Sequence, residues 1–263
     1  MTGSLAPTRR LLSHGSPLAA AAAAAAEAAA ARNPLFRAEI TRVRDIADVR
    51  ILRLKATRKV EENLPTGETR LEGPFAFQAG QWVDFMAPGV EKVGGFTITS
   101  APISTPGLAE AVGMPSNMDE FELVVKKANW PPAQWIHTAA KIGTEVQVRV
   151  GGDFTLEQRG VLQTNSDGHH HWGCDHLLLL SGGLGINPLF SMLLRIADVS
   201  SVHSRLPKVT LAMSARDRSH LLFLDQVRTL ASGPLRDSLK VVAALTRGPG
   251  SEAPIAPGIS AGG

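Results

Sequence analysis

The chain has 263 residues, of which 44% are hydrophobic and 19% charged, so it is long enough to fold into two ordinary domains with a sizeable core. Its formal net charge of +3 is small, and no run of Lys and Arg argues for a nucleic-acid partner. A single cysteine excludes a disulfide framework. Outside the alanine-rich first residues, no stretch has the apolar length of an integral membrane span.

Residues 1–32 have the composition of a targeting leader. They carry Arg9 and Arg10 together with serines, contain no acidic residue before Glu27, and are otherwise mostly alanine. A helix-prone segment with Arg and Ser and few acids is typical of a mitochondrial presequence. The alternatives are a plain alanine-rich tail and the apolar region of a secretory signal. We expect a mitochondrial transit peptide, and hence a mitochondrial protein, and exclude this segment from the fold.

Residues 36–154 are expected to form short antiparallel strands. In residues 145–150 three valines alternate with three polar residues, which is the period of a strand with one buried face. Turn residues such as Gly80 and Gly143 separate the candidate strands. The other candidates are residues 75–77, 82–86 and 121–126. Several short strands with turns between them predict an antiparallel β-barrel or sandwich.

Residues 176–246 show a different pattern. A continuous apolar run at 177–180 predicts a strand, and after a glycine-rich turn residues 187–196 have the pattern of an amphipathic or buried helix. Asn187 is expected to cap this helix through its side-chain oxygen, with Pro188 at the first helical position. The next expected elements are a strand at 208–213, a helix at 221–230 and a strand at 239–245. This order predicts an α/β domain with a parallel sheet of three strands.

Two segments are expected to lie outside both domains. Residues 155–175 are interpreted as a linker, and residues 247–263, mostly Ala, Pro, Ile and Gly, as a disordered tail. The linker contains three consecutive histidines that end at His171. Such histidines rarely form a preorganised site, and no ladder of carboxylates or cysteines accompanies them, so we expect no metal site. Cys174 is expected to be a structural thiol.

The glycine-rich turn is the strongest candidate for a binding site. Its sequence is Gly182-Gly183-Leu184-Gly185-Ile186-Asn187. Glycines let the backbone turn sharply and approach a ligand, and the following helix offers free amides and a partial positive charge to a phosphate. The alternative is a tight turn without a ligand. The strand before the turn and the helix after it favour nucleotide binding.

The turn differs from the standard dinucleotide fingerprint, because the third glycine would fall at Pro188. The acidic residue that would bind the ribose is not evident at the end of the second strand, which reads Ser214-Ala215-Arg216. An ordinary NAD dehydrogenase is therefore disfavoured. Arg216 is the candidate contact for a nucleotide ribose or phosphate, and a solvated arginine is the alternative.

Taken in order along residues 36–246, these motifs resemble those of ferredoxin-reductase-like flavoenzymes. The motifs that carry the resemblance are Gly80-Gln81-Trp82-Val83, the run over 94–102, the segment 143–154 and the glycine-rich turn. The resemblance implies an FAD-binding β-barrel over 36–154 and an NAD-binding α/β domain over 176–246. It also implies FAD and NAD or NADP as cofactors. By resemblance Phe96 would cover the flavin ring, Thr97 would reach the flavin, and Asn187 would lie on the nicotinamide side.

The sequence departs from the family pattern at several places. The arginine that pairs with the flavin pyrophosphate in the family corresponds to Gly94, so a bidentate charged contact is missing. The family's small residues at a second phosphate-binding turn correspond to Pro132 and Ala133. The family's later strand ending in Cys-Gly-Pro is not found. We therefore expect a C-terminally truncated α/β domain whose first strand is an exposed apolar edge that could bind a partner.

Two functions follow from these patterns. The first is an oxidoreductase that transfers electrons from NAD(P)H through a flavin to an acceptor that the sequence does not identify, with no catalytic residue assigned. The second is a catalytically inactive nucleotide-binding or interaction protein. The sequence does not distinguish NADH from NADPH.

Overall fold

The computed structural model describes residues 33–59, 74–166, 170–202, 205–246 and 259–261. From Pro34 onward the chain forms one compact unit. The expected leader at residues 1–32 lies outside the described residues. None of the helices in the described part of the chain is long and apolar enough to cross a membrane.

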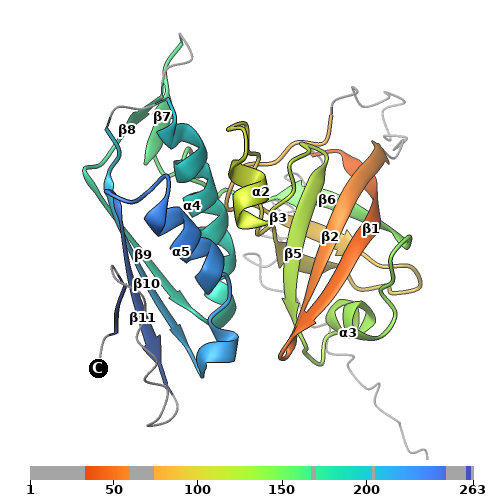
Figure 1. Ribbon diagram of the computed structural model, residues 1–263. Coiled ribbons are helices and arrows are strands. Elements are labelled where there is room, and N and C mark those ends of the chain that lie inside the picture. The colour runs from red at the N-terminus through yellow and green to blue at the C-terminus, as the bar shows by residue number, and fades with distance from the viewer. Residues whose placement is uncertain (1–32, 60–73, 167–169, 203–204, 247–258, 262–263) are drawn as a thin grey trace, which may run out of the picture. The chain divides into compact units, whose positions relative to one another are not determined.

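The first half of the unit is a six-stranded antiparallel sheet in the order β4-β3-β6-β1-β2-β5 (Figure 1). Its strands are β1 (Leu35–Ile46), β2 (Val49–Lys59), β3 (Trp82–Met86), β4 (Gly94–Thr97), β5 (Glu120–Lys126) and β6 (Glu145–Gly151). The predicted strands at 82–86, 121–126 and 145–150 are confirmed. The predicted strand at 75–77 is wrong: the Phe75 ring instead stacks on Phe121, with 5.0 Å between ring centroids.

The two ends of this sheet meet. Ile98, just after β4, forms an isolated antiparallel bridge with Leu123 of β5, and the backbone N–H of Thr99 donates to the carbonyl of Glu122 at 2.8 Å. No continuous ladder joins β4 to β5, so a single bridge brings the edges together. The side chains of β6 alternate between the two faces of the sheet: its three valines are buried, while the residues between them are partly exposed. The sheet therefore encloses an apolar core.

The second half is a parallel sheet in the order β12-β11-β10-β9. Its elements are β9 (His176–Gly182), α4 (Ile186–Ser200), β10 (Lys208–Ala215), α5 (Leu224–Ser232), β11 (Leu239–Leu245) and β12 (Ile259–Ala261). The first three strands follow one another in one direction, so right-handed crossovers place α4 and α5 on the same face (Figure 1). On β9, Leu179 is buried, whereas Leu178 and Leu180 are 61% and 67% exposed.

Strands occur in both segments that were expected to lie outside the two domains. The expected linker holds a hairpin of β7 (Leu162–Thr164) and β8 (His170–Trp172), because Leu156 and Leu162 are buried and join the core of the α/β half. Most of the expected tail, residues 247–258 and 262–263, lies outside the described residues, and within its described part β12 pairs in parallel with β11 as a fourth strand. Three residues are too few to show a hydrophobic period, which is why β12 was not predicted.

Short helices complete the barrel half. These are α2 (Leu108–Val112) and α3 (Pro131–Thr138), the latter with prolines at its first two positions. The barrel half is tied to α4 by buried hydrogen bonds. The Ser191 hydroxyl accepts from the N–H of Gly80 at 3.2 Å and donates to the carbonyl of Ser100, and Asp198 accepts from the backbone N–H groups of Ser104 and Thr105. These bonds hold loops of the barrel half against the helix that follows the glycine-rich turn.

Candidate nucleotide-binding site

The glycine-rich turn has more space than the fold requires. Gly183 has φ +51°, a conformation that favours glycine, but Gly182 and Gly185 have ordinary φ values of −126° and −59°. A Cβ added at Gly185 would meet no atom within 4 Å, and one at Gly182 would meet only the Ser214 hydroxyl at 3.6 Å. Neither backbone strain nor packing explains these two glycines. Open space over the turn suits a ligand that approaches the backbone closely.

The helix after the turn begins earlier than predicted. The turn forms a 3₁₀ helix, η1 (Gly183–Gly185), which runs directly into α4, so that the N-cap is Gly185 and no side chain caps the helix. The prediction that Asn187 is the cap is therefore wrong. Its side chain is buried, and its Nδ2 donates to the Val124 carbonyl of β5 at 3.1 Å. Its Oδ1 is buried without a hydrogen-bond partner. Asn187 thus links the turn to the barrel and keeps one acceptor unused.

A small pocket of about 40 Å³ opens at the turn. Its wall combines Gly183 and Leu184 with Asp48 from the β1–β2 turn, Lys126 at the end of β5, and His220. Three of these side chains are charged or titratable. Lys126 Nζ lies 3.5 Å from the Asp48 carboxylate, and Asp48 also lies 3.2 Å from His220. Burial opposes the ionisation of Asp48, but Lys126 and His220 outweigh it, so the pKa of Asp48 lies below its ordinary value. The pocket therefore contains an ion pair between Asp48 and Lys126.

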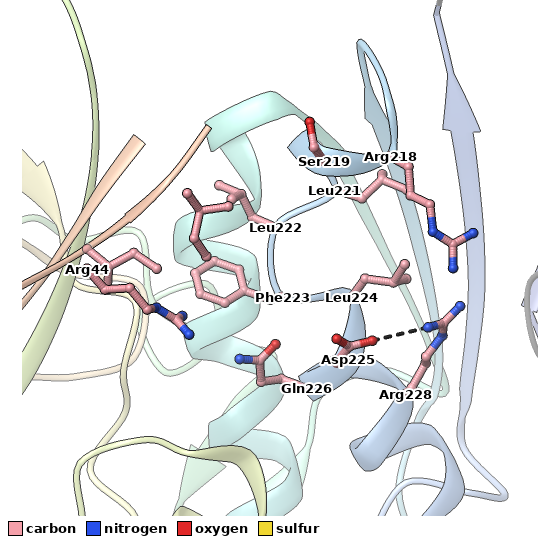
Figure 2. Close-up of a pocket in the computed structure, with 12 residues that line it drawn as sticks. Arg44, Arg218, Ser219, Leu221, Leu222, Phe223, Leu224, Asp225, Gln226 and Arg228 are labelled. Atoms are coloured by element: carbon pink, nitrogen blue, oxygen red, sulfur yellow. Dashed lines mark hydrogen bonds and ion pairs between the residues drawn. The ribbon is translucent and has the colours of Figure 1, made fainter. Parts of the chain in front are cut away.

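A larger pocket of about 320 Å³ lies beside the start of α5 (Figure 2). Arg44, Arg218 and Arg228 contribute to its wall, and Arg228 is paired with Asp225 at 3.1 Å. None of the predicted cofactor residues lines this pocket. We place the candidate site at the smaller pocket, because Gly183 and Leu184 of the glycine-rich turn line it.

The second strand brings Arg216 to the edge of the turn. Strands β9 and β10 pair in parallel with Ser214 opposite Gly182, so the residues after β10 lie beside the turn. Arg216 contacts two neighbouring side chains there. Its Nε donates to the carboxylate of Asp217 at 3.3 Å, and its Nη2 lies 2.8 Å from Nε2 of His220. Asp217 and His220 were not predicted, although the position of Asp217 directly after Arg216 was a usable signal.

The flavin candidates lie on the barrel. Phe96 and Thr97 belong to β4, and the Phe96 ring packs edge-on against the Phe85 ring with 5.7 Å between centroids. A Cβ added at Gly94 would lie 2.5 Å from the Phe96 ring and 2.8 Å from Pro132. The missing arginine therefore has no room in this packing. A partly exposed Phe96 can still cover a planar ring, but no cation stands at position 94 to meet a diphosphate.

The histidines of the former linker have other partners. His170 bonds to the Thr164 hydroxyl at 2.6 Å and His171 to the side-chain oxygen of Gln163 at 2.9 Å, both across the β7–β8 hairpin. Within the part of the chain that the structure describes, no group of three or more His, Cys, Asp or Glu residues is placed to hold a metal ion. Burial raises the pKa of the Cys174 thiol, with Asp175 adding to the effect.

Comparison with known proteins gives a consistent result. The chain is 43% identical over 156 residues to oxidoreductase NAD-binding domain-containing protein 1 of Xenopus tropicalis. The aligned region covers 57% of this chain and 43% of that protein. The chain spans about half the length of the curated relatives it matches. No family model matches it.

Solved structures agree on the fold. The cytochrome b5 reductase domain of Ulva prolifera nitrate reductase has a TM-score of 0.56 at 20% identity, over 86% of this chain and 85% of that one. The ferredoxin-NADP+ reductase of Plasmodium falciparum has a TM-score of 0.55 at 12% identity, over 81% of this chain and 70% of that one. The predicted resemblance is confirmed: the chain has the fold of the ferredoxin-reductase-type oxidoreductases and is similar in sequence to oxidoreductase NAD-binding domain-containing protein 1.

Proposed function

We propose that the chain binds NAD(P)H at the glycine-rich turn and transfers electrons from it through a flavin to an acceptor that stays unidentified. The observation that carries this proposal is the open space over Gly182 and Gly185, whose backbone angles and packing do not require glycine. The names of its relatives, an NAD-binding oxidoreductase and a ferredoxin-NADP+ reductase, support the same reading.

The residues of the turn suit a nicotinamide nucleotide. The N-terminus of α4 lies at the turn and carries the positive end of the helix dipole, which favours the negative charge of a nucleotide diphosphate, although the N–H of Ile186 already donates within the turn and Pro188 has none. The unused Oδ1 of Asn187 can accept from an amide N–H, such as that of the nicotinamide carboxamide. In this arrangement Asn187 fixes the orientation of the ring end while its Nδ2 stays bonded to β5.

The barrel offers partners for the flavin ring but few for its diphosphate. Phe96 and Thr97 are partly exposed on β4 and can meet the ring, but Gly94 supplies no charge. Pro131 and Pro132 at the start of α3 also lack the N–H groups that would otherwise bind a phosphate. When bound, the flavin would supply the hydride and electron-transfer chemistry. We therefore expect the chain to bind the flavin ring while holding its diphosphate weakly.

The second candidate function is a nucleotide-binding or interaction protein without catalytic activity. The absence of a cation at position 94 favours it, as does the apolar β9, which ends the parallel sheet among the described strands and can accept a partner strand there. This candidate requires nucleotide binding at the same turn but no reduction of a flavin.

The substitution Gly185→Val tests the nucleotide site. The backbone at Gly185 suits any residue and its surroundings are open, so the fold should tolerate valine to within about 1 kcal/mol, while its side chain fills the ligand space. We expect the Kd for NADH, measured by titration calorimetry on the full chain, to rise at least about tenfold. Gly95→Val, at an exposed barrel position, is the matched control and should bind NADH like the wild type. Unchanged affinity in Gly185→Val would contradict the proposed site.

A further inference from the structure

The pocket of about 320 Å³ beside the start of α5 takes no part in the proposed function. Both halves of the compact unit contribute to its wall: Arg44 and Ile46 belong to β1, Ile51 belongs to β2, and Leu222 and Phe223 lie directly before α5 (Figure 2). Small-molecule sites have volumes of roughly 300–1,000 Å³ and combine apolar walls with a few polar groups. The size and the lining of this pocket therefore suit a small ligand.

The charged groups of the pocket are mainly positive. Arg44, Arg218 and Arg228 line it, with Asp225 as the acidic lining residue, and Oδ1 of Asp225 accepts from Nη1 of Arg228 at 3.1 Å. The side chains of Arg44 and Arg218 have no hydrogen bond or ion pair with any residue that the structure describes. Nε of Arg228 is buried, and it too lacks a partner among those residues. The pocket therefore has more positive charge than its own residues neutralise.

The start of α5 adds to this positive potential. Leu224, Asp225 and Gln226 form its first turn and line the pocket, and no side chain caps the helix. Phe223, which precedes the helix, has φ +61°, a conformation that is rare for an aromatic residue, and its ring stacks on Phe190 with 4.2 Å between centroids. The packed ring holds the helix N-terminus at the pocket. A helix N-terminus carries a partial positive charge and favours an anion.

A second pocket of about 140 Å³ continues this surface along the barrel strands. It shares Arg44 and Gln226 with the first pocket and adds Arg42 and Arg53 to the lining. Arg53 is paired with Glu122 at 3.3 Å, whereas the side chain of Arg42 has no hydrogen bond or ion pair among the described residues. An anion in the first pocket therefore also lies in the positive potential of the second.

The arginines reach the first pocket from different elements. In Figure 2, Arg44 of β1 and Arg218 of the 3₁₀ turn η2 (Arg218–His220) lie on opposite sides of Leu222 and Phe223. A guanidinium group binds a carboxylate or a phosphate through two parallel N–H bonds. We propose that this pocket binds a small polyanion with at least two acid groups, carboxylates or phosphates, which bridges Arg44 and Arg218. This site is separate from the nucleotide site, because no residue of the glycine-rich turn lines the pocket.

The test titrates the full chain with citrate, with inorganic tripolyphosphate and with acetate at constant ionic strength, by calorimetry. We expect citrate or tripolyphosphate to bind at least about tenfold more tightly than acetate, because acetate has a single acid group. The tighter of the two polyanions identifies the acid groups as carboxylates or phosphates. Binding of neither polyanion, or binding of acetate with equal strength, would overturn the proposal.

Two substitutions locate the binding within the chain. Arg44→Gln and Arg218→Gln should each raise the Kd of the tighter polyanion at least about tenfold. Both variants should fold, because the two side chains are exposed and unpaired among the described residues. Arg236→Gln is the matched control: it removes an exposed arginine that does not line the pocket, and it should leave the Kd within about twofold of the wild type. An equal loss in Arg236→Gln would show nonspecific attraction and overturn the site.

The substitution Asp225→Asn tests the site by a gain of binding. The side chain of Asp225 is 90% exposed, so the variant should fold while the pocket loses its carboxylate. We expect the polyanion to bind at least about threefold more tightly than it binds the wild type, because a repulsive charge is removed. Saturation with NADH should leave the Kd of the polyanion unchanged. Competition between NADH and the polyanion would place both in the nucleotide site and contradict a separate pocket.

Discussion

Glu122 lies at the point where the two ends of the barrel sheet meet, and its carboxyl group is buried. Its backbone joins the seam by accepting from Thr99 and by donating to the Ser100 hydroxyl, while its side chain lies 3.3 Å from Arg53. Loss of water around the carboxyl raises the pKa of Glu122, and the charge of Arg53 only partly opposes this. The sequence could not identify this residue as buried, because glutamate normally faces solvent, whereas five consecutive residues of β5 are buried.

The raised pKa has a consequence for stability. A group whose pKa is higher in the folded state stabilises the fold fully below its unfolded value, here 4.5, and the contribution is lost as pH rises through the folded value. Glu122→Gln removes this titration. Urea unfolding from about pH 4 to about pH 8 should show the variant gaining stability relative to wild type as the pH rises. Glu120→Gln on the same strand is the control for charge. A difference between Glu122→Gln and wild type that stays constant across this range would contradict the account.

Among single residues of the candidate site, the sequence predicted the glycines but not the roles of their neighbours. The open space over Gly185 agrees with the predicted ligand approach. Asn187 was assigned to the wrong partner: the helix starts two residues earlier than predicted, and the Asn187 side chain bonds to β5. The cluster of Asp217, His220 and Asp48 could not be predicted as a whole, because Asp48 comes from a distant hairpin and only the folded chain places it beside His220.

At the scale of elements, strands with a clear hydrophobic period were predictable, and strands that depend on pairing with distant residues were not. Strand β6 alternates along its whole length, and its predicted range differs by one residue from the structure. The hairpin of β7 and β8 and the short β12 lack such a pattern, because pairing partners and a few buried leucines place them. The predicted apolar edge is present: β9 ends the parallel sheet among the described strands, with Leu178 and Leu180 exposed.

This edge should drive self-association. Exposed apolar side chains beside unpaired backbone groups favour pairing with another strand. We expect the wild-type chain to show concentration-dependent oligomers in sedimentation velocity, and Leu180→Lys to shift the population toward monomer at least about threefold. Val202→Lys is the control, because Val202 is equally apolar and 73% exposed but follows α4 and not the sheet edge. A monomeric wild type, or an equal effect of both substitutions, would contradict this interpretation.

At the scale of the whole molecule, the barrel and the α/β half were predicted from sequence, and the bonds between them were not. The contacts of Ser191, Asp198 and Asn187 with the barrel join residues that are distant in the chain, and no local pattern indicates them. They matter for function because they hold the glycine-rich turn against the barrel strands. Through them the nucleotide site and the flavin candidates belong to one compact unit.

The most direct test of this account is the reduction of flavin by NADH under anaerobic conditions. The full chain is mixed with excess FAD, so that weak binding of the diphosphate does not limit the result, and the visible flavin absorbance is followed after NADH is added. The account predicts that the wild-type chain accelerates bleaching at least about tenfold over free FAD, and that Gly185→Val loses most of this acceleration. A folded wild-type chain that binds NADH but bleaches FAD no faster than buffer would contradict the oxidoreductase assignment and leave the nucleotide-binding role.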